Sequence, residues 1–428
     1  MRQRPSDLTA TQARQQIERA SLRVVDWVDD CLERISQLDA ELQAWTVIDD
    51  DAAKAAARLA DANPGSGLLH GVPLGLKDNI DTSDFPTTYG SGIYTNHRPV
   101  LDATCASLCK SAGAITLGKT ASTEFAYRTP SPCRNPHNLG HSPGGSSSGS
   151  AAAVAARMVP LAIGTQTGGS VIRPAAYCGV YGFKPRYGEL SFAGVKNLAP
   201  SFDTLGLMAR SLNDLSLFHA ALHRARFSPV ESSHIAAPKL AVYRSAFWDE
   251  AQPAARACLE QMVDRLADAG AGLHEVRLDE LDRRMLEASW VVNKYEASRQ
   301  FLGDWMTRPD GFSKALHALV TEGLTIDIRD YHAARETFEM ARRLMGDALD
   351  RFDAVITLPS PGEAPAGLQD TGPVTFNFIW TAVHMAAVNL PIFKGPTGLP
   401  IGMQVVSPRW NHQQLLEVSD WIEKRMQD

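Results

Sequence analysis

Cysteine is scarce in this sequence, and the few cysteines present are scattered. The 428 residues include six, at positions 31, 105, 109, 133, 178 and 258, and none of them forms a C-x-x-C pair. So low a density excludes a disulfide-dense scaffold and indicates free thiols in a reducing compartment. We therefore expect a cytoplasmic protein.

Long apolar runs and a strong net charge are also missing. No window approaches 18 uninterrupted apolar residues, so no membrane span is expected. The N-terminal M-R-Q-R-P-S-D leads into a polar helical stretch, which is not typical of a signal peptide. A formal net charge of −6 gives no electrostatic footprint for nucleic acid. H-E-x-x-H and Cys/His zinc spacings are absent, so the sequence predicts neither a metal nor a cofactor.

Two glycine-rich turns, each carrying a serine, stand out in what is present. Ser146 lies in G-G-S-S-S-G and Ser170 lies in T-G-G-S, separated by an Ala-rich helical stretch and a short apolar strand. Backbone N–H groups in such turns can face a developing oxyanion, so a neighbouring hydroxyl is a candidate nucleophile. The alternative is two structural loops around a core helix. The apolar run after Ser170, V-I-R-P-A-A-Y-C-G-V-Y-G-F-K-P, places the second turn inside the fold.

Secondary-structure signals alternate between strands and helices, which indicates an α/β sheet flanked on both faces. Apolar periodicity and Pro/Gly punctuation predict the element boundaries. Helices are predicted over 50–61, 102–112, 250–269, 376–390 and 411–425 and over most of 281–350, and strands over 113–118, 176–184, 239–243, 353–357 and 401–406.

The order of several motifs resembles the amidase signature family, with a pattern similar to the short malonamidase-like members. The motifs that carry the resemblance are H-G-V-P-L-G-L-K-D-N-I-D-T (70–82), G-A-I-T-L-G-K-T-A-S-T-E-F-A (113–126), S-S-S-G-S-A-A-A-V, G-T-Q-T-G-G-S-V-I-R-P, Y-G-F-K-P-R-Y-G (181–188) and F-D-T-L-G (202–206). The resemblance implies one α/β domain with a mixed, twisted sheet covered by helices on both faces. Family members are often dimers, so a homodimer is expected.

Within this single amidase domain, 1–428, four segments are predicted. They are a helical N-terminal segment (1–65), a signature core (66–215), a variable substrate-pocket region (235–395) and a C-terminal strand and helix (396–428). The pocket wall is expected to come largely from 285–385, where Trp290, Trp305, Phe376, Phe378, Trp380 and His384 either line the pocket or fill the core.

The resemblance implies a catalytic set of Lys77, Ser146 and Ser170. Ser170 would be the nucleophile, Lys77 the ultimate base, and Ser146, held by a cis peptide bond after Gly145, the proton relay. A serine hydroxyl needs a neighbouring base, and lysine serves only when neutral, so burial must lower its pKa from about 10.4. Apolar neighbours in L-G-L-K supply that burial, whereas Asp78 would oppose the shift if its carboxylate came close. The alternative for Lys77 is a solvated strand end.

Further site roles follow from the second turn. Thr167, Gly168 and Gly169, with Ser170, would offer backbone N–H groups to the substrate carbonyl. Arg173 stands where the malonamidase-like pattern has its arginine, and we expect it either to bind a substrate carboxylate or to form a structural ion pair. Gln166 replaces an Asp of many family members. Serines 147 and 148 are expected to be helix N-caps.

One misleading motif accompanies the family pattern. Residues 113–120, G-A-I-T-L-G-K-T, fit the Walker A consensus letter for letter. A phosphate cradle requires a glycine-rich loop between strand and helix, whereas A-I-T-L is typical of an apolar strand. We therefore do not expect nucleotide binding.

Together these patterns predict an amidase that cleaves a C–N bond of a small-molecule amide through an acyl-enzyme on Ser170. Two alternatives stay open. One is a glutamine-dependent amidotransferase subunit of a tRNA-linked complex, which shares the three catalytic positions. The other is an ester or carbamate hydrolase that uses the same triad. The sequence does not identify the substrate.

Overall fold

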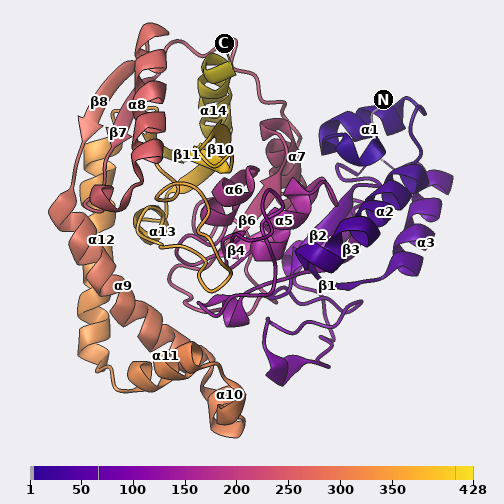
Figure 1. Cartoon of the computed structure of the whole chain (residues 1–428), viewed down its shortest axis with the longest axis horizontal. Coiled ribbons are helices and arrows are strands. Elements are labelled where there is room, and N and C mark those ends of the chain that lie inside the picture. The colour runs from indigo at the N-terminus through magenta and orange to yellow at the C-terminus, as the bar shows by residue number, and fades with distance from the viewer. Residues whose placement is uncertain (1–3, 66, 410, 428) are drawn as a thin grey trace.

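One mixed sheet of eleven strands organises the residues described by this computed structural model, which are 4–65, 67–409 and 411–427 (Figure 1). The strand order is β1-β3-β2-β4-β6-β5-β10-β11-β9-β7-β8. The strands are β1 (Trp45–Ile48), β2 (Pro73–Lys77), β3 (Ile115–Thr120), β4 (Leu161–Gln166), β5 (Tyr181–Lys184), β6 (Thr204–Ala209), β7 (Lys239–Tyr243), β8 (Gly272–Val276), β9 (Ala354–Thr357), β10 (Ala386–Lys394) and β11 (Pro400–Ser407).

Helices surround this sheet, and α9 to α12 extend from it as an outer layer (Figure 1). No helix among the described residues is long and apolar enough to cross a bilayer. The helices are α1 (Ala10–Glu18), α2 (Val24–Leu42), α3 (Asp50–Ala62), α4 (Thr104–Ser111), α5 (Ser148–Ala155), α6 (Ile172–Cys178), α7 (Leu212–Leu222), α8 (Pro253–Asp268), α9 (Asp279–Gln300), α10 (Leu302–Thr307), α11 (Lys314–Leu324), α12 (Ile328–Leu349), α13 (Phe378–Ala382) and α14 (His412–Gln427).

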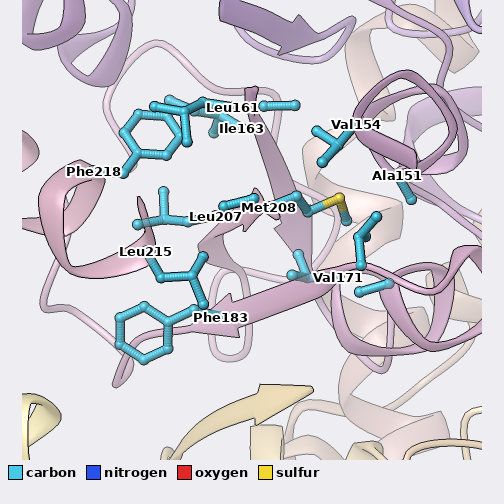
Figure 2. Close-up of a cluster of buried hydrophobic side chains, with 14 of the residues drawn as sticks. Ala151, Val154, Leu161, Ile163, Val171, Phe183, Leu207, Met208, Leu215 and Phe218 are labelled. Carbon is cyan, nitrogen blue, oxygen red and sulfur yellow. The ribbon is translucent and has the colours of Figure 1, made fainter. Parts of the chain in front are cut away.

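The centre of the sheet is covered on both faces, as predicted. Because side chains alternate along a strand, Leu207 and Met208 of β6 point in opposite directions. Figure 2 shows Leu207 near Leu215 of α7, while Met208 lies on the side of Val154 of α5. Both β6 side chains are fully buried. Apolar packing on two sides therefore fixes β6, which pairs with β4, the strand that leads into the turn of Ser170.

Parallel pairing aligns the ends of the motif-bearing strands. Strand β2 runs parallel to β3 and β4, and Leu76 is in register with Ile163. The carboxyl ends of β2 and β4 therefore meet at one edge of the sheet. Lys77 is the last residue of β2, and the turn that contains Ser170 follows β4 directly.

Most predicted elements are present within a few residues of their expected boundaries, but the strand prediction over 176–184 is partly wrong. Helix α6 occupies the first part of that segment and ends at Gly179, whose φ of 67° is left-handed. Only Tyr181–Lys184 is a strand. A short apolar run does not distinguish a buried helical turn from a buried strand, because both lack a polar face.

The helix predicted over 376–390 is also largely wrong. Helix α13 has only five residues, and β10 begins at Ala386 and pairs with both β5 and β11. Its first five residues are buried on both faces, so the alternation that identifies a strand is missing from A-A-V-N-L. The predicted division into four segments within one domain stays a prediction.

Candidate active site

Lys77 is a fully buried lysine in contact with a serine hydroxyl. Its Nζ lies 2.6 Å from Ser146 Oγ and 2.7 Å from Thr165 Oγ1. Burial lowers the pKa of Lys77 to about 7, and the negative charge of Asp203 opposes this shift. The alternative of a solvated strand end is therefore wrong, and a neutral amine is accessible near neutral pH.

Asp78 does not oppose the lowered pKa of Lys77, because its carboxylate points away. It lies 3.4 Å from the buried Nζ of Lys119 and accepts hydrogen bonds from Thr88. Lys119 also donates to Ile80 O and Thr87 Oγ1, each at 2.6 Å. The lysine of the Walker-like motif is thus inside strand β3, and the segment is not a phosphate loop.

Ser146 follows a tight glycine turn. The Gly145–Ser146 peptide bond is cis, as predicted, and Gly144 has a φ of 79° that favours glycine. The Ser147 hydroxyl does not cap α5 but bonds Thr165, accepting from its N–H and donating to its carbonyl at 3.2 Å. Ser148 donates to Gly144 O at 2.8 Å. Ser147 therefore occupies the predicted N-cap position, but the expected capping bond is absent, because the hydroxyls of the two serines join the turn to β4 and to Gly144 instead.

Ser170 lies in the turn between β4 and α6, next to the turn of Ser146. The N–H of Ser147 donates to Ser170 O at 3.3 Å, which joins the two turns directly. Gln166 Oε1 accepts the N–H groups of Val171 and Ile172 at 2.8 and 3.0 Å. The neutral side chain of Gln166 therefore joins the start of the second turn to its end.

The predicted oxyanion residues line the same turn. Thr167 Oγ1 donates to Asp203, a buried carboxyl whose pKa burial raises to about 7. The carbonyls of Gly168 and Gly169 accept from Thr381 Oγ1 and from the N–H of Arg173. Within the described chain, the N–H groups of these two glycines donate no hydrogen bond of their own. Both donors are therefore available to a ligand.

Gly169 is required by packing, because a Cβ there would lie 2.4 Å from Asn377 Oδ1. A side chain at this position would displace the turn that carries Ser170. The small residue thus lets the backbone of the second turn approach the buried amide of Asn377.

Arg173 is buried in α6 without a carboxylate partner among the described residues. Its Nη2 donates to Gly145 O at 2.6 Å, and its Nη1 donates to Pro373 O at 2.9 Å. Its Nε is buried and has no hydrogen-bond partner in the described structure. Burial lowers the pKa of Arg173 to about 10, so the group stays charged near neutral pH. The structural ion pair expected as one alternative for Arg173 is therefore not formed among the described residues. Its guanidinium instead binds backbone carbonyl groups.

A pocket of about 450 Å³ opens beside Ser170. Thr167, Gly168, Ser170 and Arg173 line it, together with Trp290 of α9 and the segment 369–375. Within the region expected to supply the wall, Trp290 and Phe378 line the pocket. Phe376 and Trp380 belong to the packed core, and Trp305 and His384 lie outside the lining.

Three residues of this site were missed in the sequence. Thr165 contacts Lys77, Asp203 holds Thr167, and Arg128 lines the pocket with its guanidinium 4.8 Å from the Trp290 ring. Asp203 lies within the F-D-T-L-G motif, which indicated that the segment belongs to the family core but did not indicate what Asp203 contacts. Arg128 had no such signal, because its place depends on the packing of α9.

Solved structures with a similar fold include amidases. A peptide amidase from Stenotrophomonas maltophilia superposes with a TM-score of 0.84 at 26% identity, covering 98% of this chain and 97% of that one. A chain of a vestigial protein complex, linked to the origins of an s-triazine catabolic enzyme, has a TM-score of 0.89 at 27% identity and covers 98% of both. The fold therefore defines an enzyme that hydrolyses amide bonds.

The family model described as Amidase matches residues 26–416, so the chain belongs to the amidase signature family. Among curated relatives, a glutamyl-tRNA(Gln) amidotransferase subunit of Roseiflexus sp. (strain RS-1) is 31% identical over 465 residues. That alignment covers 96% of this chain and 95% of the relative.

The two hydrogen bonds accepted by Gln166 give a prediction for stability. Gln166→Leu should lower the free energy of unfolding by about 1–3 kcal/mol, because the N–H groups of Val171 and Ile172 would be buried without partners. Urea denaturation measures the change. Gln37→Leu, at an exposed helix position, is the control and should change it by less than about 0.5 kcal/mol. Equal effects of the two variants would contradict the anchoring role.

Proposed function

We propose that this enzyme hydrolyses the C–N bond of a small amide through an acyl-enzyme on Ser170, with Ser146 relaying a proton to Lys77. The observation that carries the proposal is the 2.6 Å contact between the buried Nζ of Lys77 and Ser146 Oγ. A lysine kept neutral by burial can accept a proton from a hydroxyl at hydrogen-bond distance.

The order of steps follows from this arrangement. Ser170 Oγ attacks the carbonyl carbon and gives its proton to Ser146 Oγ, while the Ser146 proton moves to Lys77 Nζ. The C–N bond breaks as a proton returns along the same path to the leaving nitrogen. Water then hydrolyses the ester on Ser170, with the same groups acting as the base.

Stabilisation of the oxyanion is assigned to the backbone of the second turn. We propose the N–H groups of Thr167, Gly168, Gly169 and Ser170 as donors to the substrate oxygen. Removal of a comparable donor in other hydrolases costs about 3–4 kcal/mol in the barrier, so these groups would provide much of the rate. Fixed backbone donors need no reorganisation during the reaction.

Arg173 is proposed to select a substrate that carries a carboxylate. It lines the pocket beside Ser170, stays charged, and has no carboxylate partner among the described residues. A substrate carboxylate would supply the missing negative charge. Neutral amides, esters and carbamates are the substrates expected if Arg173 instead only holds the Gly145 carbonyl.

A second candidate function is favoured by the curated relatives, which are subunits of glutamyl-tRNA(Gln) amidotransferase. This chain would then release ammonia from glutamine within a complex. The malonamidase-like S-V-I-R-P after Ser170 favours the free hydrolase. Purification separates them, because a homomer that turns over simple amides supports the hydrolase, whereas an obligate partner supports the amidotransferase.

Location and assembly belong to the same proposal. All six cysteines are free and buried, which is compatible with the cytoplasmic location that we propose. A homodimer is proposed from the family resemblance alone, and sedimentation measures it.

Ser170→Ala should abolish covalent labelling by a fluorophosphonate and reduce kcat by about four to six orders of magnitude, because the attacking oxygen is removed. Ser36→Ala, on an exposed helix position, is the control and should keep both. Mass spectrometry of the trapped acyl-enzyme locates the adduct. An adduct on Ser146 or Ser147 would overturn the assignment.

The pH dependence of kcat/KM tests Lys77. The active form is the neutral amine and burial lowers its pKa to about 7, so activity should rise as pH increases through 7 and then level off. Lys77→Met should remove this rise together with most of the rate. The exposed Lys239→Met control should keep the wild-type profile. An unchanged profile in Lys77→Met would identify another group as the base.

Arg173→Ala tests carboxylate binding with one acid amide and its neutral isostere. Loss of the Gly145 contact should slow both substrates, and the acid amide should lose about 2–5 kcal/mol more transition-state stabilisation. Arg173→Lys should not restore the difference, because an ammonium cannot form two parallel bonds. Arg343→Ala, at an exposed position outside the pocket lining, is the matched control and should leave turnover of both substrates unchanged. Equal losses on both substrates would leave Arg173 with a positioning role only.

A further inference from the structure

Three histidines and a glutamate gather away from the pocket, where three distant segments meet. Glu189 follows β5, His219 and His223 lie one helical turn apart at the end of α7, and His412 begins α14. Helix α14 packs against α7, and both are labelled in the upper part of Figure 1. None of the four residues lines the pocket beside Ser170.

All three imidazoles direct a nitrogen at one carboxylate oxygen. Glu189 Oε1 lies 2.9 Å from His219 Nε2, 3.5 Å from His223 Nε2 and 3.4 Å from His412 Nδ1. The ring of His219 lies 4.3 Å from that of His223 and 4.1 Å from that of His412. Ligand atoms of Glu189, His219 and His223 all lie within 4.8 Å of one another.

The nitrogen–oxygen separations are close to the distance between neighbouring ligand atoms around a metal ion. Metal–ligand bonds of about 2.0–2.2 Å in tetrahedral geometry place neighbouring ligand atoms about 3.3 Å apart. An ordinary ion pair uses a single imidazole, and only His219 makes an aligned hydrogen bond to Glu189 here. His223 Nε2 and His412 Nδ1 lie 3.5 and 3.4 Å from the same oxygen, and neither forms a hydrogen bond to it.

We propose that Glu189, His219 and His223 form a structural site for a divalent transition-metal ion, with His412 beside Glu189 as a neighbouring group and with Zn²⁺ as the ion that the geometry favours. Imidazole nitrogens with one carboxylate suit Zn²⁺, and Co²⁺ can replace it as a spectroscopic probe. The ion would join the segment after β5 to α7. The site departs from the expectation that the chain holds no metal.

Co²⁺ titration of the chelator-treated full chain tests the proposal. The wild type should bind one equivalent, with the visible absorption of low-symmetry, near-tetrahedral Co²⁺, and Zn²⁺ should displace it. Thermal unfolding should shift upward as Zn²⁺ is added, because only the folded chain brings the ligands together. Neither readout depends on amide turnover, so failure of the proposed function would leave this test intact.

Variants on the exposed side of the cluster keep the test independent of folding. His223→Ala and His412→Ala should each weaken calorimetric Zn²⁺ binding by at least about tenfold, since even an outer-sphere partner is worth 10–100-fold. The matched control is His234→Ala, because His234 lies 3.4 Å from a carboxylate outside the cluster, that of Glu417. Absence of stoichiometric binding to the wild type, or equal weakening in the control, would overturn the site.

Discussion

The arrangement of the site depends above all on one interaction: the amine of Lys77 is buried and no carboxylate contacts it. Among the described residues, Lys77 Nζ meets only hydroxyl and carbonyl oxygens, from Ser146 and Thr165. An adjacent carboxylate would hold the lysine protonated. Asp78, the nearest acid in sequence, is instead paired with Lys119, and Asp203 is occupied by Thr167 and by backbone N–H groups. Because each acid is paired elsewhere, the pKa of Lys77 stays low.

The sheet register supplies this environment, and that explains why the positions of Lys77 and Ser170 near one edge of the sheet were predictable from the sequence. Lys77 and Ser170 each lie at the end of a buried strand or in the turn after it, and β2 and β4 are parallel neighbours. Such positions can be recognised in local motifs, because a buried strand end or a tight turn requires apolar residues or glycines close by in the sequence. The partners of Lys77 were less visible. Thr165 resembles an ordinary strand residue, and only the pairing of β2 with β4 brings it to the amine.

Features that depend on contacts between distant segments were not predictable in the same way. The sequence of β10 favours a helix because the strand is buried on both faces and so carries no period of two. The histidine cluster contains one local signal, H-A-A-L-H at 219–223, which places two imidazoles on one face of a helix. Its other members, Glu189 and His412, come from segments that only the fold brings together. A search for ligand spacing along the chain therefore could not find the cluster.

Arg173 links the part of the site that the motifs predicted to the part that they did not. Its guanidinium holds the carbonyl of Gly145 in the catalytic turn and the carbonyl of Pro373 in the pocket wall. Three of its N–H groups are used in this way, counting the contact with Thr371 Oγ1, and Nε has no partner in the described chain. Carbonyl dipoles only partly offset the cost of burying a full charge. An anion bound beside the 369–375 segment would offset the remaining cost of burying the Arg173 charge. It would also interact with the side chain that binds the Gly145 carbonyl before Ser146. Substrate charge and the placement of the relay serine would then be coupled through one residue.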